Sequence, residues 1–175
     1  MRTRVGYCGG SKKSPTYYRL GNHTEAFQID FDPEKLSYAE LLRMFWNGHN
    51  PCRSAWSTQY KSAVFVGSES QRKTAEDSRA RLEKKLGKIH TEVLPLDDFY
   101  LAEDYHQKYL LQNHAELSQE FRAIYPKFSD FLNSTAAARV NGYLGGQGTP
   151  AQLQEEIDQL GLSEKGQKLL RARVQ

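Results

Sequence analysis

The stretch RVGYCGGSKKSPTYYRLGNHTEAFQIDFDP, residues 4–33, decides the fold because it holds two strand patterns separated by a loop. Apolar and polar residues alternate over residues 3–7, which predicts a half-buried strand ended by two glycines. Lysines, a Ser-Pro pair and a Gly-Asn pair predict a loop over residues 11–23. A second alternation over residues 27–31 predicts another strand. The chain therefore starts with a β-loop-β arrangement.

Helix and strand patterns then alternate along the chain. The segment SYAE, residues 37–40, is a capping box that opens a predicted helix with one apolar face. QYKSAVFV, residues 59–66, predicts a third strand, residues 69–86 a long polar helix, and KIHTEVL, residues 88–94, a fourth strand. The order β, β, α, β, α, β predicts an α+β sandwich with helices packed on one sheet face.

The C-terminal third has a different pattern. Helical segments are broken at Pro126 and over residues 141–150, and two short helices with spaced leucines follow. We therefore predict an α+β domain over residues 1–115 and a helical extension over residues 116–175 that packs on it.

Composition is that of a globular protein, with 26% charged and 38% hydrophobic residues among 175. Because no apolar run is long enough to cross a bilayer and no secretory signal is visible, we expect a cytoplasmic protein. The net charge of +3 comes without a basic stripe, which argues against nucleic-acid binding. Two cysteines, Cys8 and Cys52, do not make a disulfide framework, so we expect reduced thiols. Because the chain has no CxxC motif and no His/Cys ligand spacing, we expect no metal.

Polar and aromatic side chains gather near the ends of the predicted strands. They are Tyr17, His23, Glu25, Tyr60, Tyr105 and His106. A partly desolvated carboxylate beside phenols could act as a proton donor. Alternatively, buried tyrosines simply hydrogen-bond their hydroxyls, and His106 is a core histidine with satisfied ring nitrogens. The pattern alone favours this second interpretation.

Four segments resemble, in the same order, the signatures of the peptide methionine sulfoxide reductase A family. They are RTRVGYCGG, SPTYYRLGNHTEAFQIDFDPEKLSYAELLRMFWNGHNP, STQYKSAVF and FYLAEDYHQKYL, between about residues 2 and 112. DFLNSTAAARVNGYLGGQGT, residues 130–149, resembles the tail of a divergent subgroup of that family. The resemblance implies a ferredoxin-like sandwich and a thiol-dependent reduction of methionine-S-sulfoxide, free or within proteins, to methionine.

The resemblance also implies roles for individual residues. Glu25 matches the glutamic acid that protonates the departing oxygen, and Tyr17 and Tyr60 match tyrosines that hydrogen-bond it. The residues expected to support the pocket are His23, Tyr105 and His106. No bound cofactor is implied, because a thioredoxin-like protein or another external dithiol reduces the oxidised thiol. We expect oxidised proteins or free methionine sulfoxide as substrates, and a monomer.

The sequence departs from the family pattern at the nucleophile. In the family, Gly-Cys-Phe-Trp precedes Val-Gly-Tyr-x-Gly-Gly, whereas here only residues 1–4 precede it. We therefore expect an N-terminally shortened form that lacks the first strand and helix, with Cys52 as a candidate secondary thiol. Ala55 and Leu144 replace an aspartate and a resolving cysteine of the family. A catalytically inactive module that binds methionine sulfoxide or a partner, and an unstable fragment, stay open as alternatives.

Overall fold

The computed structural model describes residues 1–174, and these form two compact units. The first, here the helical unit, joins Met1–Val5 and Phe27–Asp30 to the segment that starts at Glu103. The second, here the αβ unit, consists of Gly6–Ala26 and Phe31–Ala102. The division between residues 115 and 116 stays a prediction, since compactness divides the chain at residue 102 and shares two strands between the units.

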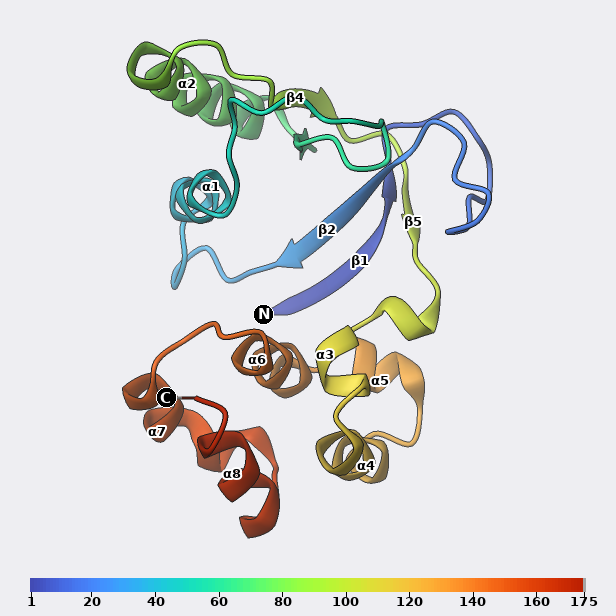
Figure 1. Ribbon diagram of the computed structural model, residues 1–175, viewed down its shortest axis with the longest axis vertical. Helices are drawn as coiled ribbons and strands as arrows, with labels where there is room; N and C mark the ends of the chain where they lie inside the picture. Colours follow the sequence, from blue (N-terminus) through green and yellow to red (C-terminus); the bar gives the residue numbers. More distant parts are fainter. Residues whose placement is uncertain (175) are drawn as a thin grey trace. The chain divides into compact units, whose positions relative to one another are not determined.

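Three strands, β1 (Arg2–Cys8), β2 (Thr24–Asp30) and β5 (Phe99–Leu101), form a sheet in the order β2-β1-β5 (Figure 1). β5 pairs antiparallel with β1, and Gly6 lies opposite Leu101. A Cβ atom on Gly6 would come within 2.3 Å of the Tyr100 carbonyl oxygen, so only glycine fits here. The first two predicted strands are confirmed, with β2 starting earlier than expected. The sequence did not predict β5, because three residues are too short to show a period.

The other sheet is parallel and has two strands, β3 (Ala63–Val66) and β4 (Glu92–Pro95), joined by helix α2 (Glu69–Leu86). Parallel neighbours need such a crossover connection. The predicted third strand, residues 59–66, begins later than expected because residues 59 and 60 lie in a turn. The expectation of a single sheet is also wrong, although the α+β class is confirmed. The ferredoxin-like arrangement stays a prediction.

Helix α1 (Tyr38–Asn47) packs on α2 and closes the core of the αβ unit (Figure 1). The predicted capping box is present, since the Ser37 amide donates to Glu40 Oε2 at 2.8 Å and the Glu40 amide to Ser37 Oγ at 3.2 Å. Trp46 Nε1 donates to Ser78 Oγ of α2 at 3.0 Å. The buried side chains of this core are Leu42, Trp46, Val66, Ala75 and Ile89. Both predicted helices are therefore confirmed.

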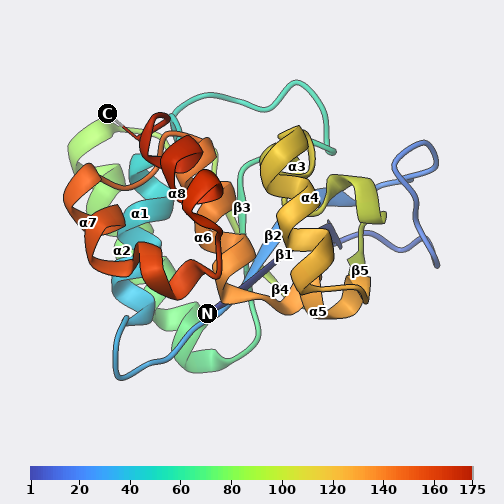
Figure 2. The same cartoon turned by 90° about the horizontal axis from the view of Figure 1, so that it is seen from below.

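The helical unit contains short helices packed around a second core. They are η1 (Asp104–His106), α3 (Tyr109–Gln112), α4 (Ala115–Ile124), α5 (Phe128–Asn133), α6 (Thr135–Leu144), α7 (Pro150–Glu156), η2 (Ile157–Leu160) and α8 (Glu164–Arg171). Figure 2 shows α6 beside α8. The predicted break over residues 141–150 is partly wrong, because α6 continues to Leu144. The buried Tyr143 side chain explains this continuation, since it adds packing to the last turn.

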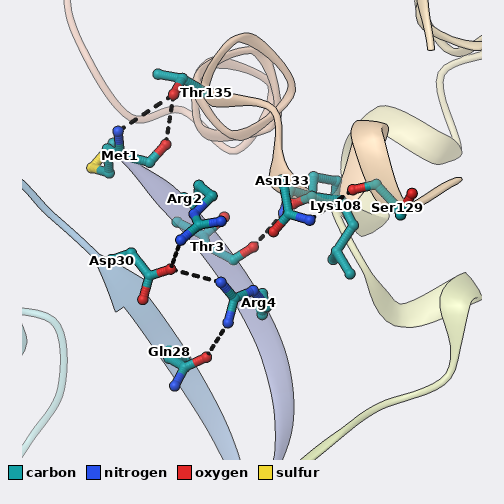
Figure 3. Close-up of polar contacts among 11 residues, drawn as sticks. Met1, Arg2, Thr3, Arg4, Gln28, Asp30, Lys108, Ser129, Asn133 and Thr135 are labelled. Atoms are coloured by element: carbon teal, nitrogen blue, oxygen red, sulfur yellow. Dashed lines mark hydrogen bonds and ion pairs between the residues drawn. The ribbon is translucent and has the colours of Figure 1, made fainter. Parts of the chain in front are cut away.

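Lys108 joins the start of β1 to the helices within the helical unit (Figure 3). Its backbone is left-handed, with φ of 46°, and its side chain is buried. The ammonium group donates to the Thr3 carbonyl and, at 2.7 Å, to the Leu132 carbonyl. Burial lowers the pKa of Lys108 to about 8, and the charge of Arg4 acts in the same direction. One buried amine thus holds two backbone carbonyls that are far apart in sequence.

Two arginines of β1 hold the neighbouring strand in the same unit (Figure 3). Asp30 Oδ2 accepts from Arg4 Nη2 at 2.6 Å and lies 2.9 Å from Arg2 Nη2. Thr135 at the start of α6 donates its hydroxyl to the Met1 carbonyl at 2.7 Å. The first residues of the chain are therefore bound by side chains of both β2 and α6. Within residues 1–174, no helix has the length and apolar character needed to cross a membrane.

Candidate functional site

The side chain of Gln59 connects two of the predicted site residues in the αβ unit. Gln59 Nε2 donates to Glu25 Oε1 at 2.7 Å and to the Tyr60 hydroxyl at 3.1 Å. The Glu25 amide donates in turn to the Gln59 carbonyl at 3.0 Å. Glu25 lies at the start of β2, and Tyr60 lies in the turn before β3. The fold thus brings together a carboxyl group and a phenol from separate segments.

Tyr17, from the loop after β1, completes this group. A hydrogen bond with Tyr17 raises the pKa of Tyr60, and partial burial and the charge of Glu25 act in the same direction. The Tyr60 hydroxyl therefore keeps its proton at neutral pH and can donate it in a hydrogen bond. We call Tyr17, Glu25, Gln59 and Tyr60 the Gln59 cluster. All three residues predicted to bind the sulfoxide oxygen belong to it.

The exposure of Glu25 differs from the expectation. The sequence predicts a partly desolvated carboxylate, but Glu25 is exposed and its neighbour Thr24 is 2% exposed. Successive residues of a strand point to opposite faces, and here the face of Thr24 is buried whereas that of Glu25 is exposed. Thr24 takes the buried face and donates its hydroxyl to the Thr58 carbonyl at 2.9 Å. That bond holds β2 against the turn that carries Gln59.

Sequence reasoning missed two residues of this region. Gln59 is part of the motif that contains Tyr60, but the sequence pattern assigns it no role. Its position directly before that tyrosine is the signal that could have identified it. Trp56 is not among the residues predicted for the site. Its ring centroid lies 4.9 Å from that of Tyr60, and 78% of its surface is exposed. An exposed tryptophan beside a polar cluster offers an apolar wall to a ligand.

His23 is fully buried and fixes the loop that leads to Tyr17. Its Nδ1 accepts from the Gly10 amide at 3.2 Å, so Nε2 carries the proton and donates to the Lys12 carbonyl at 2.8 Å. A Cβ atom on Gly10 would come within 2.6 Å of the imidazole ring. His23 thus holds the loop by two hydrogen bonds, and its support of a substrate pocket stays a prediction.

Tyr105 and His106 lie in η1, within the helical unit. Their ring centroids are 4.2 Å apart, and Tyr105 is half exposed. The Gln59 cluster belongs to the αβ unit. The contribution of this pair to the pocket therefore stays a prediction.

The two thiols have different environments. Cys8 is 1% exposed, and burial raises its pKa to about 11, so its thiolate is scarce at neutral pH. Cys52 is partly exposed in the loop after α1, where its Sγ lies 3.8 Å from the Leu86 carbonyl oxygen. These environments disfavour Cys8 as a nucleophile and leave Cys52 accessible to other thiols.

Comparisons with known proteins identify the family of the chain. Residues 1–151 match the family described as Peptide methionine sulfoxide reductase. A peptide methionine sulfoxide reductase of Drosophila melanogaster is 39% identical over 166 residues, which are 93% of this chain and 66% of that protein. The crystal structure of Mxr1 from Saccharomyces cerevisiae in reduced form is 31% identical, with a TM-score of 0.60 over 63% of this chain and 70% of that one.

Other relatives carry the same description. Peptide methionine sulfoxide reductase A5 of Oryza sativa is 34% identical over 182 residues, covering 98% of this chain and 70% of that protein. This chain spans 66% of the Drosophila protein and 60% of a Vibrio cholerae relative, so it corresponds to only part of their length. With the family match over residues 1–151, these similarities show that the chain belongs to the peptide methionine sulfoxide reductase family.

Proposed function

We propose that the protein acts in the thiol-dependent reduction of methionine-S-sulfoxide, free or within proteins, to methionine. The observation that carries the proposal is the bridge by which Gln59 Nε2 joins the Glu25 carboxyl at 2.7 Å and the Tyr60 hydroxyl at 3.1 Å. This bridge holds an acid beside a phenol, and the hydrogen bond between Tyr17 and Tyr60 adds a second phenol. Hydrogen-bond donors and an acid are what a departing sulfoxide oxygen needs. Family membership supports the same activity.

Each group of the Gln59 cluster has a role in this proposal. The hydroxyls of Tyr17 and Tyr60 donate hydrogen bonds to the sulfoxide oxygen, whose negative charge grows as the S–O bond weakens. Glu25, as the carboxylic acid, transfers its proton to that oxygen. Gln59 is a positioning residue, since its amide orients the carboxyl group that must meet the oxygen.

The proposed reaction balances with thiols as the only reductant. A thiolate attacks the sulfoxide sulfur, the oxygen passes to the thiol as a sulfenic acid, and methionine leaves. A second thiol condenses with the sulfenic acid, which releases water and forms a disulfide. An external dithiol, such as a thioredoxin-like protein, reduces the disulfide. Cys52 is our candidate for a secondary thiol in this sequence.

A second function is favoured by the environment of Cys8. Because its thiol is buried and its pKa is about 11, it is a poor nucleophile. A chain that uses neither cysteine for attack would bind oxidised methionine through the Gln59 cluster without reducing it. Both functions require the same sulfoxide-binding site, and they differ only in turnover.

The experiment combines turnover and binding on the 175-residue chain. Methionine-S-sulfoxide and dithiothreitol are added, and methionine is measured by chromatography. Turnover that iodoacetamide abolishes and that Glu25→Gln lowers by about 100-fold or more supports the reductase. Binding of the sulfoxide in preference to methionine, without turnover, supports the binding module. A chain that shows neither turnover nor sulfoxide preference contradicts both functions.

A further inference from the structure

The αβ unit contains a second feature beside the turn that carries Gln59 and Tyr60. It is an open polar cavity of about 300 Å³. The lining residues that matter here are Arg53, Ser54, Ser57, Lys61, His90 and Glu92. Most of them carry hydrogen-bond donors, so the cavity differs from the apolar pockets that hold most small molecules.

The charges of this lining leave one cation without a partner. Lys61 Nζ lies 3.1 Å from Glu92 Oε2, so these two groups neutralise one another. Within residues 1–174, the Arg53 amide donates to the Asn50 carbonyl at 3.2 Å, and its exposed guanidinium makes no hydrogen bond or ion pair. One arginine, one lysine and one carboxylate together contribute a formal charge of +1 to the lining. The unpaired charge belongs to an arginine, which can grip a carboxylate with two parallel hydrogen bonds.

Serine hydroxyls line the same cavity as this arginine. Ser54 Oγ lies 3.3 Å from His90 Nδ1, which ties the loop to the residues before β4. Ser57 Oγ is buried, and within the part of the chain that the structure describes it has no hydrogen-bond partner. Burying a hydroxyl without a hydrogen bond costs free energy, so a polar ligand that bonds to Ser57 would stabilise this loop.

The cavity is close to the Gln59 cluster along the chain. Thr58 and Lys61 both line it, and Gln59 and Tyr60 lie between them. Neighbouring residues are about 3.8 Å apart between Cα atoms, so the Tyr60 backbone is within about 8 Å of both lining positions. An extended peptide advances about 3.3 Å per residue. A substrate with its methionine at Tyr60 would therefore bring a residue one or two positions away to this cavity.

We propose that the cavity binds the carboxylate of an aspartate or glutamate one or two residues from the oxidised methionine. This inference rests on the proposed function and adds a substrate class, namely acidic peptides. Arg53 pairs with the carboxylate, and the serine hydroxyls donate to its remaining lone pairs. Arg53 does not touch the sulfoxide, so it selects the substrate and takes no part in the chemistry.

The test uses four acetylated pentapeptides with the full chain. Their central residue is methionine or methionine-S-sulfoxide, and the residue next to it is aspartate or asparagine. Dissociation constants are measured by isothermal titration at low salt. We expect the aspartate peptides to bind about three- to fivefold more tightly than their asparagine partners, in both oxidation states. Arg53→Gln removes this difference and leaves the asparagine peptides unchanged.

A matched control removes a cation elsewhere in the same unit. Lys73 lies on the exposed face of α2 and pairs with Asp77, so Lys73→Gln should keep the aspartate preference. Equal affinity for aspartate and asparagine peptides, or a preference that persists in Arg53→Gln, overturns the inference. An aspartate preference without any sulfoxide preference upholds the cavity and counts against the proposed function alone.

Discussion

The two units differ in what holds them together. Among residues 1–174, the core of the helical unit contains twelve buried hydrophobic residues, whereas the corresponding cluster of the αβ unit contains five. The Gln59 cluster and the polar cavity both belong to the αβ unit, and most of their residues lie in loops or turns. Chemistry-bearing side chains therefore occur where burial is small and polar contacts set the geometry, as is common for loops on a rigid scaffold.

The largest loss of stability is expected from a substitution in the core of the helical unit, because this core is the larger of the two. Phe121 is fully buried and its ring stacks near Tyr125, with centroids 6.0 Å apart. Phe121→Ala should lower the free energy of unfolding by about 3–5 kcal/mol, through lost burial and a cavity. Urea titration measures this loss. A loss below about 1 kcal/mol would show that the larger core is not the more stable one.

The next largest effect on stability is expected at Lys108, a buried charged residue of the helical unit. Replacing it in Lys108→Met leaves the carbonyls of Thr3 and Leu132 without this donor, at a cost of about 1–3 kcal/mol. The pKa falls from 10.5 to about 8 on folding, so between these values the unfolded chain binds the proton and the folded chain does not. Stability contributed by this group therefore rises with pH through that window.

Urea titrations at pH 7.5 and 9.5 check this pH dependence. The wild type should gain stability relative to Lys108→Met as the pH rises. A loss of stability relative to Lys108→Met as the pH rises would mean that the buried amine stays charged in the folded chain. Lys73→Met serves as the control, because that exposed side chain pairs with Asp77 at 3.3 Å on the surface of α2.

The smallest effect on stability is expected at the site itself. Trp56 is 78% exposed, so Trp56→Ala should change the free energy of unfolding by less than about 0.5 kcal/mol. The same change removes the ring that lies against Tyr60, and we expect sulfoxide binding to weaken several-fold. Titration of methionine-S-sulfoxide and urea unfolding on the same variant separate the two effects. A large loss of stability with unchanged binding would make Trp56 a structural residue.

Local patterns explain which parts of the fold were predictable. The capping box at Ser37 and the polar run of α2 each lie within one segment, so the sequence places both helices correctly. β5 has three residues and pairs with β1, which is more than 90 residues away, so no local period marks it. The division of the strands into two sheets likewise depends on long-range pairing that no single segment encodes.

The sequence predicts candidate members of the site, and these stay predictions, but it does not predict their environment. Family motifs identify Tyr17, Glu25 and Tyr60, whereas the exposure of Glu25 follows from which face of β2 is buried. That choice is made by Thr24 and its bond to the Thr58 carbonyl. The bridging role of Gln59 depends on a turn that brings residue 59 to residue 25, a separation that periodicity cannot detect.

A double-mutant cycle on sulfoxide binding tests the central claim that the Gln59 cluster acts as one oxygen-binding group. Dissociation constants for methionine-S-sulfoxide are measured for wild type, Glu25→Gln, Tyr60→Phe and the double variant, with methionine as the reference ligand. Because Gln59 hydrogen-bonds both groups, we predict a coupling energy of about 1 kcal/mol or more and loss of the preference for the sulfoxide. Additive effects with an intact preference would contradict the claim.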